Sequence, residues 1–254
     1  MTTPHRPLDD GGVQQQLGPL GRSIAGLAGT PDDASDIDTR LVTIARLAAD
    51  LVTPVAYASI TVLRDSAYTT VAASSELAIA VDQAQYADDS GPCLDALTDG
   101  TPVGVEDMDT TMAWPGFRRQ AARLGLNASL SVPLFAASGA TIAALNLYSH
   151  DAMAMIPLIA RVAMLYDADL AGEPGPDEPF VDAGADLANG LGEAFRVHAL
   201  IQRAIGVVMA TEECTAAVAY LSLRVRAAET GASLTEVAAA VHAYLTEPGD
   251  EPGA

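Results

Sequence analysis

The first residue with a possible chemical role is Cys93, which follows a Gly-Pro pair at the expected start of a helix. The positive end of a helix dipole lowers the pKa of a thiol, so a redox sensor is one interpretation. Free cysteines are more often buried and inert, and we expect a small core residue. The only other cysteine is Cys214, so the chain lacks a disulfide framework or a zinc knuckle, which favours a reducing cytoplasm.

The histidines and carboxylates form no recognisable catalytic set. The four histidines lack the spacing of metal ligands, and nothing supports haem. There is no Gly-rich phosphate loop and no Ser-His-Asp order, and the Asp88-Asp89 pair has no partner that we can name as a general acid. The sequence therefore predicts a protein that is not an enzyme and has no metal or cofactor.

A few aromatic residues could form the walls of a ligand pocket between a sheet and its helices, with an asparagine as polar anchor. With only 5% aromatic residues in the chain, the same side chains could equally be plain core. The candidate residues for an unidentified small-molecule ligand are Tyr86, Trp114, Phe117, Asn146 and Tyr148.

The charge balance limits the partners that the chain can bind. The sequence has 33 acidic residues against 13 basic ones, all of them arginine, and a net charge of -20. Such a charge argues against broad binding to nucleic acid or to anionic membranes, and we expect no specific DNA binding. It leaves room for a small RNA site built from a few arginines. Arg46, Asp50 and Pro54 interrupt the most apolar segment, so we expect no membrane span.

The elements that must position these residues begin after residues 1–35, which we interpret as a flexible tail. A helix is expected from residue 38 to Pro54, followed by five β-rich segments at residues 56–63, 67–73, 102–105, 128–135 and 140–149. Helices are expected at residues 92–97, 116–124 and 156–170. Residues 36–170 are thus predicted to form an α+β domain, an antiparallel sheet with flanking helices.

Three prolines in residues 171–179 predict a linker, and everything from residue 180 to 247 reads as helical, before a short tail at residues 248–254. Apolar residues alternate at steps of four and three in the first helix, which is the spacing of a coiled-coil seam: Phe180, Gly184, Leu187, Leu191, Ala194, His198, Ile201, Ile205 and Val208. His198 then lies at a dimer contact. Gly190 and Gly192 weaken this helix, so a partner or the first domain must support it.

Two shorter helices complete the C-terminal module. The second helix is expected to begin at Thr215 and to end at Gly231, and the third begins with the capping box Ser233-Leu-Thr-Glu236 and carries an apolar stripe that ends at Leu245. The module is too small to contain an enzyme pocket.

Residues 187–245 resemble the ANTAR family of bacterial RNA-binding modules, which act on nascent transcripts to prevent termination. The resemblance rests on residues 201–209, with an Ala-x-Gly-x-x-Met core, and on matching segments in the next two helices at Ala219-Tyr220, Leu223-Arg224 and Glu236-Val237-Ala238. Residues 36–170 resemble a GAF domain of the kind that precedes ANTAR modules in actinobacteria. The carrying segments there are residues 85–96, 114–117, 130–134 and 144–149.

The resemblance implies a cytoplasmic, signal-responsive regulator that binds paired RNA hairpin loops as a homodimer. It implies RNA-binding residues at Gln202, Arg203, Ala204, Gly206, Met209, Tyr220, Arg224 and Arg226. Small residues at Ala204 and Gly206 let a base or ribose approach the helix, while arginine and tyrosine bind phosphate or stack on bases. The competing explanation is that these two small residues simply permit close helix packing. Residues 182–247 carry four arginines against eight acids, so the alternative is a ligand-sensing protein whose module makes protein contacts instead.

Overall fold

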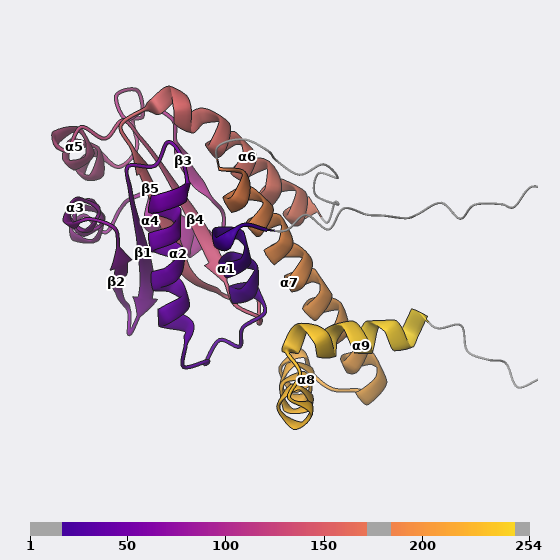
Figure 1. The fold of residues 1–254 in the computed structure, drawn as a ribbon. Helices are drawn as coiled ribbons and strands as arrows, with labels where there is room; N and C mark the ends of the chain where they lie inside the picture. Colours follow the sequence, from indigo (N-terminus) through magenta and orange to yellow (C-terminus); the bar gives the residue numbers. More distant parts are fainter. Residues whose placement is uncertain (1–16, 172–183, 247–254) are drawn as a thin grey trace, which may run out of the picture.

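The computed structural model describes residues 17–171 and 184–246 of the chain (Figure 1). The predicted linker after Ala171, Phe180 of the seam, and the tails at residues 1–16 and 248–254 lie outside the described residues. The helices are α1 (Pro19–Ala28), α2 (Ile37–Leu51), α3 (Glu76–Ala87), α4 (Pro92–Asp99), α5 (Pro115–Arg123), α6 (Ala152–Ala171), α7 (Ala185–Glu212), α8 (Ala216–Thr230) and α9 (Leu234–Thr246). The strands are β1 (Tyr57–Arg64), β2 (Ala67–Ala73), β3 (Val103–Val105), β4 (Ala128–Phe135) and β5 (Thr141–Ser149).

The five strands form one antiparallel sheet in the order β2-β1-β5-β4-β3, as the sequence predicts for an α+β domain. The β1–β2 hairpin turns at Asp65 and Ser66, which both have positive φ (49° and 63°). Two successive left-handed residues match the twist of antiparallel strands, and this explains why a two-residue turn suffices there. Among the predicted segments, every strand is found within a few residues of its expected ends.

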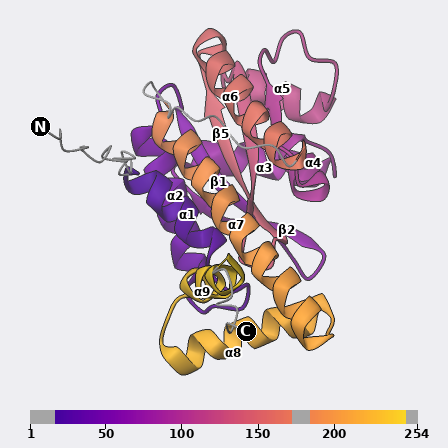
Figure 2. The same ribbon diagram turned by 90° about the vertical axis from the view of Figure 1, so that its right-hand side faces the viewer.

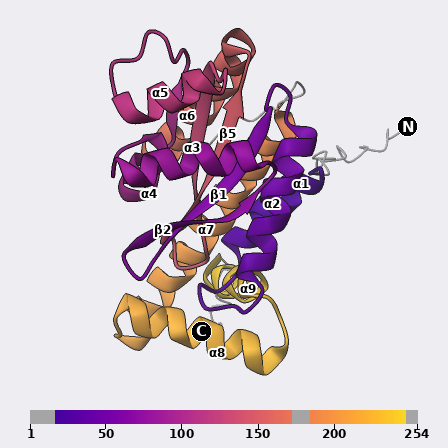
Figure 3. The same cartoon turned by 90° about the vertical axis from the view of Figure 1, so that its left-hand side faces the viewer.

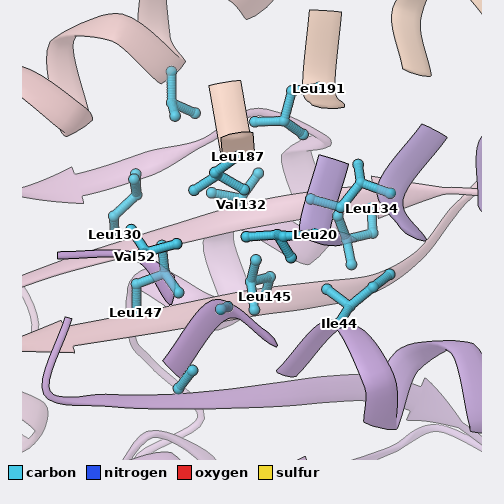
Figure 4. Packing of buried hydrophobic residues seen from close by; sticks show 14 of the residues in the cluster. Leu20, Ile44, Val52, Leu130, Val132, Leu134, Leu145, Leu147, Leu187 and Leu191 are labelled. Atoms are coloured by element: carbon cyan, nitrogen blue, oxygen red, sulfur yellow. The ribbon is translucent and has the colours of Figure 1, made fainter. Parts of the chain in front are cut away.

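The two faces of the sheet differ in chemistry. One face is apolar and packs against α1, α2, α6 and α7, with Leu130, Val132, Leu145 and Leu147 at its centre (Figure 4). The other face lies toward α3, α4 and α5, on the opposite side of the sheet (Figures 1 and 3). Because side chains alternate along a strand, the polar residues between these leucines all point to that second face.

The prediction of a flexible tail over residues 1–35 is wrong for residues 19–28. These form α1, with Leu20, Ile24 and Leu27 almost fully buried. Pro19 looks like an interruption in the sequence, but it is the first residue of α1, where its fixed φ suits a helix and its missing N–H is not needed. Helix α1 packs along α7 (Figure 2) and thereby belongs to the core of the N-terminal domain.

Two glycines set the close approach of α1 and α7. A Cβ on Gly190 would lie 2.4 Å from the Cα of Gly21, so neither helix has room for a side chain at the crossing. Asp186, in the first turn of α7, accepts a hydrogen bond of 2.9 Å from the backbone N–H of Leu20. The support that the glycine-containing helix α7 requires is therefore supplied by α1.

The predicted coiled-coil seam of α7 is covered by the chain itself. Leu187, Leu191 and Ala194 belong to the core below the sheet, whereas Ile201, Ile205 and Val208 belong to the core of the C-terminal module. The spacing correctly indicates a buried stripe but does not identify what buries it. A homodimer, which stays a prediction, must therefore use other surfaces than this stripe.

The C-terminal module has the predicted caps. Thr215 precedes α8 and accepts from the backbone N–H of Val218, and Gly231 ends α8 in the left-handed region. In the capping box before α9, Glu236 accepts from the Ser233 N–H at 2.7 Å, and Ser233 Oγ accepts from the Glu236 N–H at 3.1 Å. Within the described residues, no single helix is both long and apolar enough to cross a membrane, and only the bent pair α7 and α8, at 106°, passes that test together.

Candidate nucleic-acid interface and sensor site

The last turns of α7 present a surface that the chain does not use for its own packing. Arg203, Gly206 and Met209 are exposed. A Cβ added to Gly206 would meet nothing within 4 Å. Gly206 is therefore not required for close helix packing, which was the competing explanation for a glycine inside a helix. Another molecule can approach the backbone of α7 at this point.

Ala204 does not belong to that surface, and the prediction that it contacts RNA is corrected. Its side chain is fully buried in the core of the module, together with Ala219, Leu223 and Ala238. Ala204 lies between Ile201 and Val208 on the buried stripe of α7, so its small size serves the packing of α8 and α9. Of the two small residues in the signature, only Gly206 faces outward.

Tyr220 and Arg224 stand one turn apart on α8, with the Arg224 guanidinium 5.8 Å from the centre of the Tyr220 ring. Arg224 donates to both carboxylate oxygens of Asp33, at 2.7 and 2.9 Å. This guanidinium holds the pKa of the Asp33 carboxyl below its usual value. The Tyr220 hydroxyl lies 3.5 Å from Asp32 Oδ1. Both side chains thus contact acidic residues of the loop between α1 and α2.

The remaining predicted RNA-binding residues are engaged to different degrees. Gln202 Nε2 donates to the carbonyl of Ser138, in the turn between β4 and β5, at 3.1 Å. Arg226 pairs with Glu212 at the end of α7. Among the described residues, no ion-pair partner is found for Arg203. Arg203 and Gly206 are therefore the predicted pair most available to a new partner.

The polar face of the sheet contains a buried hydrogen-bond network that reaches across three strands. Asn146 lies in register between Ser59 of β1 and Ser131 of β4 and bonds to both side chains, at 3.2 and 2.9 Å. Tyr148, two residues along β5, donates to Asp82 of α3 at 2.6 Å. Two of the predicted ligand residues, Asn146 and Tyr148, thus occupy this network.

Asp82 is the centre of this network. It is fully buried and accepts hydrogen bonds from Ser59, Thr70 and Tyr148. Burial raises the pKa of the Asp82 carboxyl to about 6, although these hydrogen bonds oppose the increase. A buried carboxyl of this kind changes its protonation near neutral pH when its surroundings change.

The three other predicted ligand residues have separate environments. The Tyr86 hydroxyl joins the network through Thr61 and Thr70, at 2.7 and 2.9 Å. Phe117 is fully buried in an apolar cluster and acts as core. Trp114 is half-buried at the start of α5, and its Nε1 donates to Asp95 at 2.9 Å. The structure brings Tyr86, Asn146 and Tyr148 together in the network and leaves Phe117 and Trp114 beside it.

His198, at a predicted seam position, contacts residues of its own chain. Its ring lies 5.3 Å from that of Phe135, and it approaches Gly139 in the turn after β4. Burial lowers the pKa of the imidazole. His198 therefore helps to pack α7 against the turn that joins β4 and β5.

Cys93 is a buried residue with a raised thiol pKa, which argues against a redox sensor at this position. It is fully buried at the start of α4, and burial raises the pKa of its thiol to about 12. Cys214 is half-exposed.

We therefore expect a thiol reagent to label one cysteine in the native protein and two after denaturation, because only an accessible thiolate reacts. Mass spectrometry of the labelled protein identifies the site. Cys214→Ser should abolish the native labelling, and Cys93→Ser should leave it unchanged. Rapid native labelling of Cys93 would contradict the buried assignment.

Sequence reasoning did not identify Asp32, Asp33 or Asp82. A signal for Asp82 was present, since polar residues alternate in β1 (Ser59, Thr61), in β4 and in β5, and such a row predicts a polar sheet face. Ser75 also caps α3 by accepting from the Leu77 N–H at 3.1 Å, which would have located the helix that carries Asp82. No local signal connects Asp33 to Arg224. Within the described ranges, no three His, Cys, Asp or Glu side chains are grouped to hold a metal ion.

The solved structures that resemble this chain are distant from it in sequence. A type II free methionine-R-sulfoxide reductase from Thermoplasma acidophilum is 13% identical, with a TM-score of 0.36, and the match covers 62% of this chain and 93% of that one. A domain of a two-component sensor histidine kinase protein from Sinorhizobium meliloti 1021 is 16% identical, with a TM-score of 0.36, and covers 68% and 93%. Comparison with curated proteins gave no match.

Comparison with protein families matches two separate segments of the chain. Residues 34–164, more than half of the sequence, match the GAF domain, and residues 189–241 match the ANTAR domain. Both are regulatory domains, for sensing and for RNA binding, which points away from an enzyme. The chain belongs to the GAF family, and with its C-terminal ANTAR domain it has the two-domain architecture of the GAF-ANTAR regulators, signal-responsive proteins of transcription antitermination.

Proposed function

We propose that this chain prevents transcription termination by binding paired hairpin loops in nascent RNA through the end of α7 and through α8. The observation that carries the proposal is the open surface at Gly206, beside the exposed and unpaired Arg203 in the described structure. A base or ribose can reach the helix backbone there, and the guanidinium can bind a phosphate. Tyr220 and Arg224 extend the same module with a ring for stacking and a second cation.

We further propose that the GAF domain binds a small molecule at the polar face of the sheet, near Tyr86, Asn146 and Tyr148. The Ser129 hydroxyl supports this proposal, because it is buried on that face without a hydrogen-bond partner in the described residues. Ser129 of β4 is the direct cross-strand neighbour of Tyr148 of β5. A buried hydroxyl without a partner is costly, and a polar ligand that binds there would satisfy it.

Gly206→Leu is expected to reduce the affinity for a twin-hairpin RNA by at least tenfold, because the new side chain occupies the space that a base or ribose would enter. Leucine forms helix better than glycine by up to about 1 kcal/mol, so the melting temperature should not fall. Filter binding beside thermal melts measures both effects. Arg203→Ala should weaken binding less and should lower the salt dependence by about one counterion.

Gly192→Ala is the matched control, since this glycine lies in the sensor half of α7 and a Cβ there makes only an ordinary contact, 3.9 Å from Leu165. It should leave RNA binding unchanged. Wild-type RNA affinity in a folded Gly206→Leu protein would contradict the assignment of this surface.

One observation favours the alternative, a module that makes protein contacts. Val218, Leu221 and Val225 form an exposed apolar row on α8, at 52%, 57% and 46% exposure. Such a row, at steps of three and four, suits a second helix. Binding of the twin-hairpin RNA by the wild-type protein supports RNA recognition, whereas self-association that Leu221→Glu abolishes, without RNA binding, supports this alternative.

A further inference from the structure

The GAF domain and the loop that precedes it contact the ANTAR domain through side chains that are proposed to bind RNA. On the sensor side the contact consists of Asp32, Asp33 and Ser138, and on the module side of Gln202, Tyr220 and Arg224. We call this set the loop contact. We propose that the loop contact is autoinhibitory: the Asp32 and Asp33 carboxylates occupy the place of RNA phosphates at Tyr220 and Arg224, and the signal acts by releasing them. This inference rests on the proposed RNA-binding function.

The chemistry of the contact matches that of a phosphate site. Asp33 offers two oxygens to one guanidinium nitrogen, at 2.7 and 2.9 Å, and an RNA phosphate presents the same acceptors to arginine. Asp32 lies at the Tyr220 hydroxyl. RNA and the loop therefore compete for the same two side chains and cannot hold both at once.

The loop that carries both aspartates is fixed to the sheet. The carbonyl of Thr30 accepts from the N–H of Ala137 at 3.0 Å, and Asp32 accepts from the N–H of Ser138 at 3.2 Å and from its hydroxyl. Ala137 and Ser138 belong to the turn between β4 and β5. The position of the two carboxylates thus depends on the geometry of this turn.

The same two strands carry the buried network. Ser131 of β4 and Asn146 of β5 are hydrogen-bonded to each other, and both lie within the polar face that we propose for the ligand. A ligand that changes this network acts on the two strands that end in the β4–β5 turn. Strands β4 and β5 and the turn between them therefore connect the proposed ligand site to the loop contact through hydrogen bonds.

The charged part of the loop contact, between Asp33 and Arg224, is accessible to solvent. Its aspartates are exposed, and beside it lies a cleft of about 650 Å³ between the α1–α2 loop and the α8–α9 turn. Pro31 and Ala34 line one wall of this cleft, and Ala228 and Ser233 line the other. Contacts between exposed charges are weak and are screened by salt, as a reversible switch requires.

The test measures the affinity of the full chain for a twin-hairpin RNA after the loop contact is removed by Asp32→Asn with Asp33→Asn. We expect binding about tenfold tighter than in the wild type. The charge-matched control is Asp65→Asn with Asp89→Asn, which removes two exposed carboxylates outside the contact. Asparagine suits both control positions, because their φ values are 49° and 45°. The control should change the affinity much less.

A third variant identifies the residue that the loop releases. Adding Arg224→Ala to the Asp32→Asn, Asp33→Asn protein should remove most of the gain. Hydrogen exchange without RNA provides a separate readout, since amides of α8 should exchange faster once the loop contact is lost. Thermal melts confirm that each variant is folded.

The outcomes separate the two proposals. If the wild type binds RNA and Gly206→Leu does not, but the loop variant binds no more tightly than its charge-matched control, autoinhibition is overturned while the proposed function stands. If no variant binds RNA even with the loop contact removed, both are overturned. A tenfold gain that Arg224→Ala abolishes supports both.

Discussion

Gly190→Ala is expected to destabilise the folded protein by about 1 to 3 kcal/mol, although alanine is the better helix former. The added Cβ would lie 2.4 Å from the Cα of Gly21, and the obstacle is backbone that cannot rotate away. Helix α1 must therefore shift off α7, which opens the apolar packing of Leu20 and Ile24 on the core. Denaturant unfolding gives the change in free energy, and limited proteolysis after Arg22 reports the release of α1.

Gly192→Ala again provides the control for Gly190→Ala, two residues along the same helix. Its Cβ would lie 3.9 Å from Leu165, an ordinary contact, so the gain in helix propensity, up to about 1 kcal/mol, should remain. The two alanine variants should thus change stability in opposite directions and differ by about 1 to 4 kcal/mol. Equal stability of the two variants would show that the crossing of α1 and α7 is not a close contact.

The stability of the wild-type protein should depend on the protonation of Asp82, and Asp82→Asn should remove this dependence. The carboxyl has a pKa of about 6 in the folded chain, against an ordinary value of 3.8. Because the folded-state pKa is raised, the protonated Asp82 carboxyl stabilises the folded protein fully below about pH 3.8. This stabilisation is lost as the pH rises through about 6. The full change corresponds to about 3 kcal/mol.

The measurement is the difference in unfolding free energy between Asp82→Asn and the wild type at several pH values. Groups common to both proteins cancel in this difference, which should grow in favour of the variant by about 2 to 3 kcal/mol from pH 4 to pH 7.5. Asp65→Asn, which replaces an exposed carboxyl, controls for the loss of one negative charge. Parallel pH profiles for the wild type and Asp82→Asn would refute a raised pKa at this carboxyl.

Features specified by neighbouring residues could be predicted from the sequence. The capping box at Ser233 and Glu236 and the N-cap Thr215 involve groups within a few residues of each other, and the structure contains both. The β-rich composition of residues 128–135 and 140–149 also predicted β4 and β5 correctly, since such residues favour strands.

Features that depend on distant partners could not be predicted. Residues 19–28 were predicted to belong to a flexible tail because the helix that they pack against, at Gly190, lies far along the chain. The stripe on α7 showed that Leu191 is buried but not that the covering residues belong to the same chain. For Gly206 the sequence left two explanations open, and only the empty space around it excludes one of them. The role of Asp33 depends on a loop meeting α8 in space.

Helix α7 gives the protein a mechanical property that neither domain has alone. Its 28 residues form one continuous helix about 42 Å long. The first half packs against the apolar face of the sheet, and the second half packs against α8 and α9 in the C-terminal module. If the first half of α7 tilts by a few degrees, the C-terminal end of the helix moves by a few ångströms, because displacement grows with distance along the helix. The helix also crosses the boundary between the two domains, so a fragment cut at that boundary would lose half of a shared element and expose Leu187 and Leu191 to water.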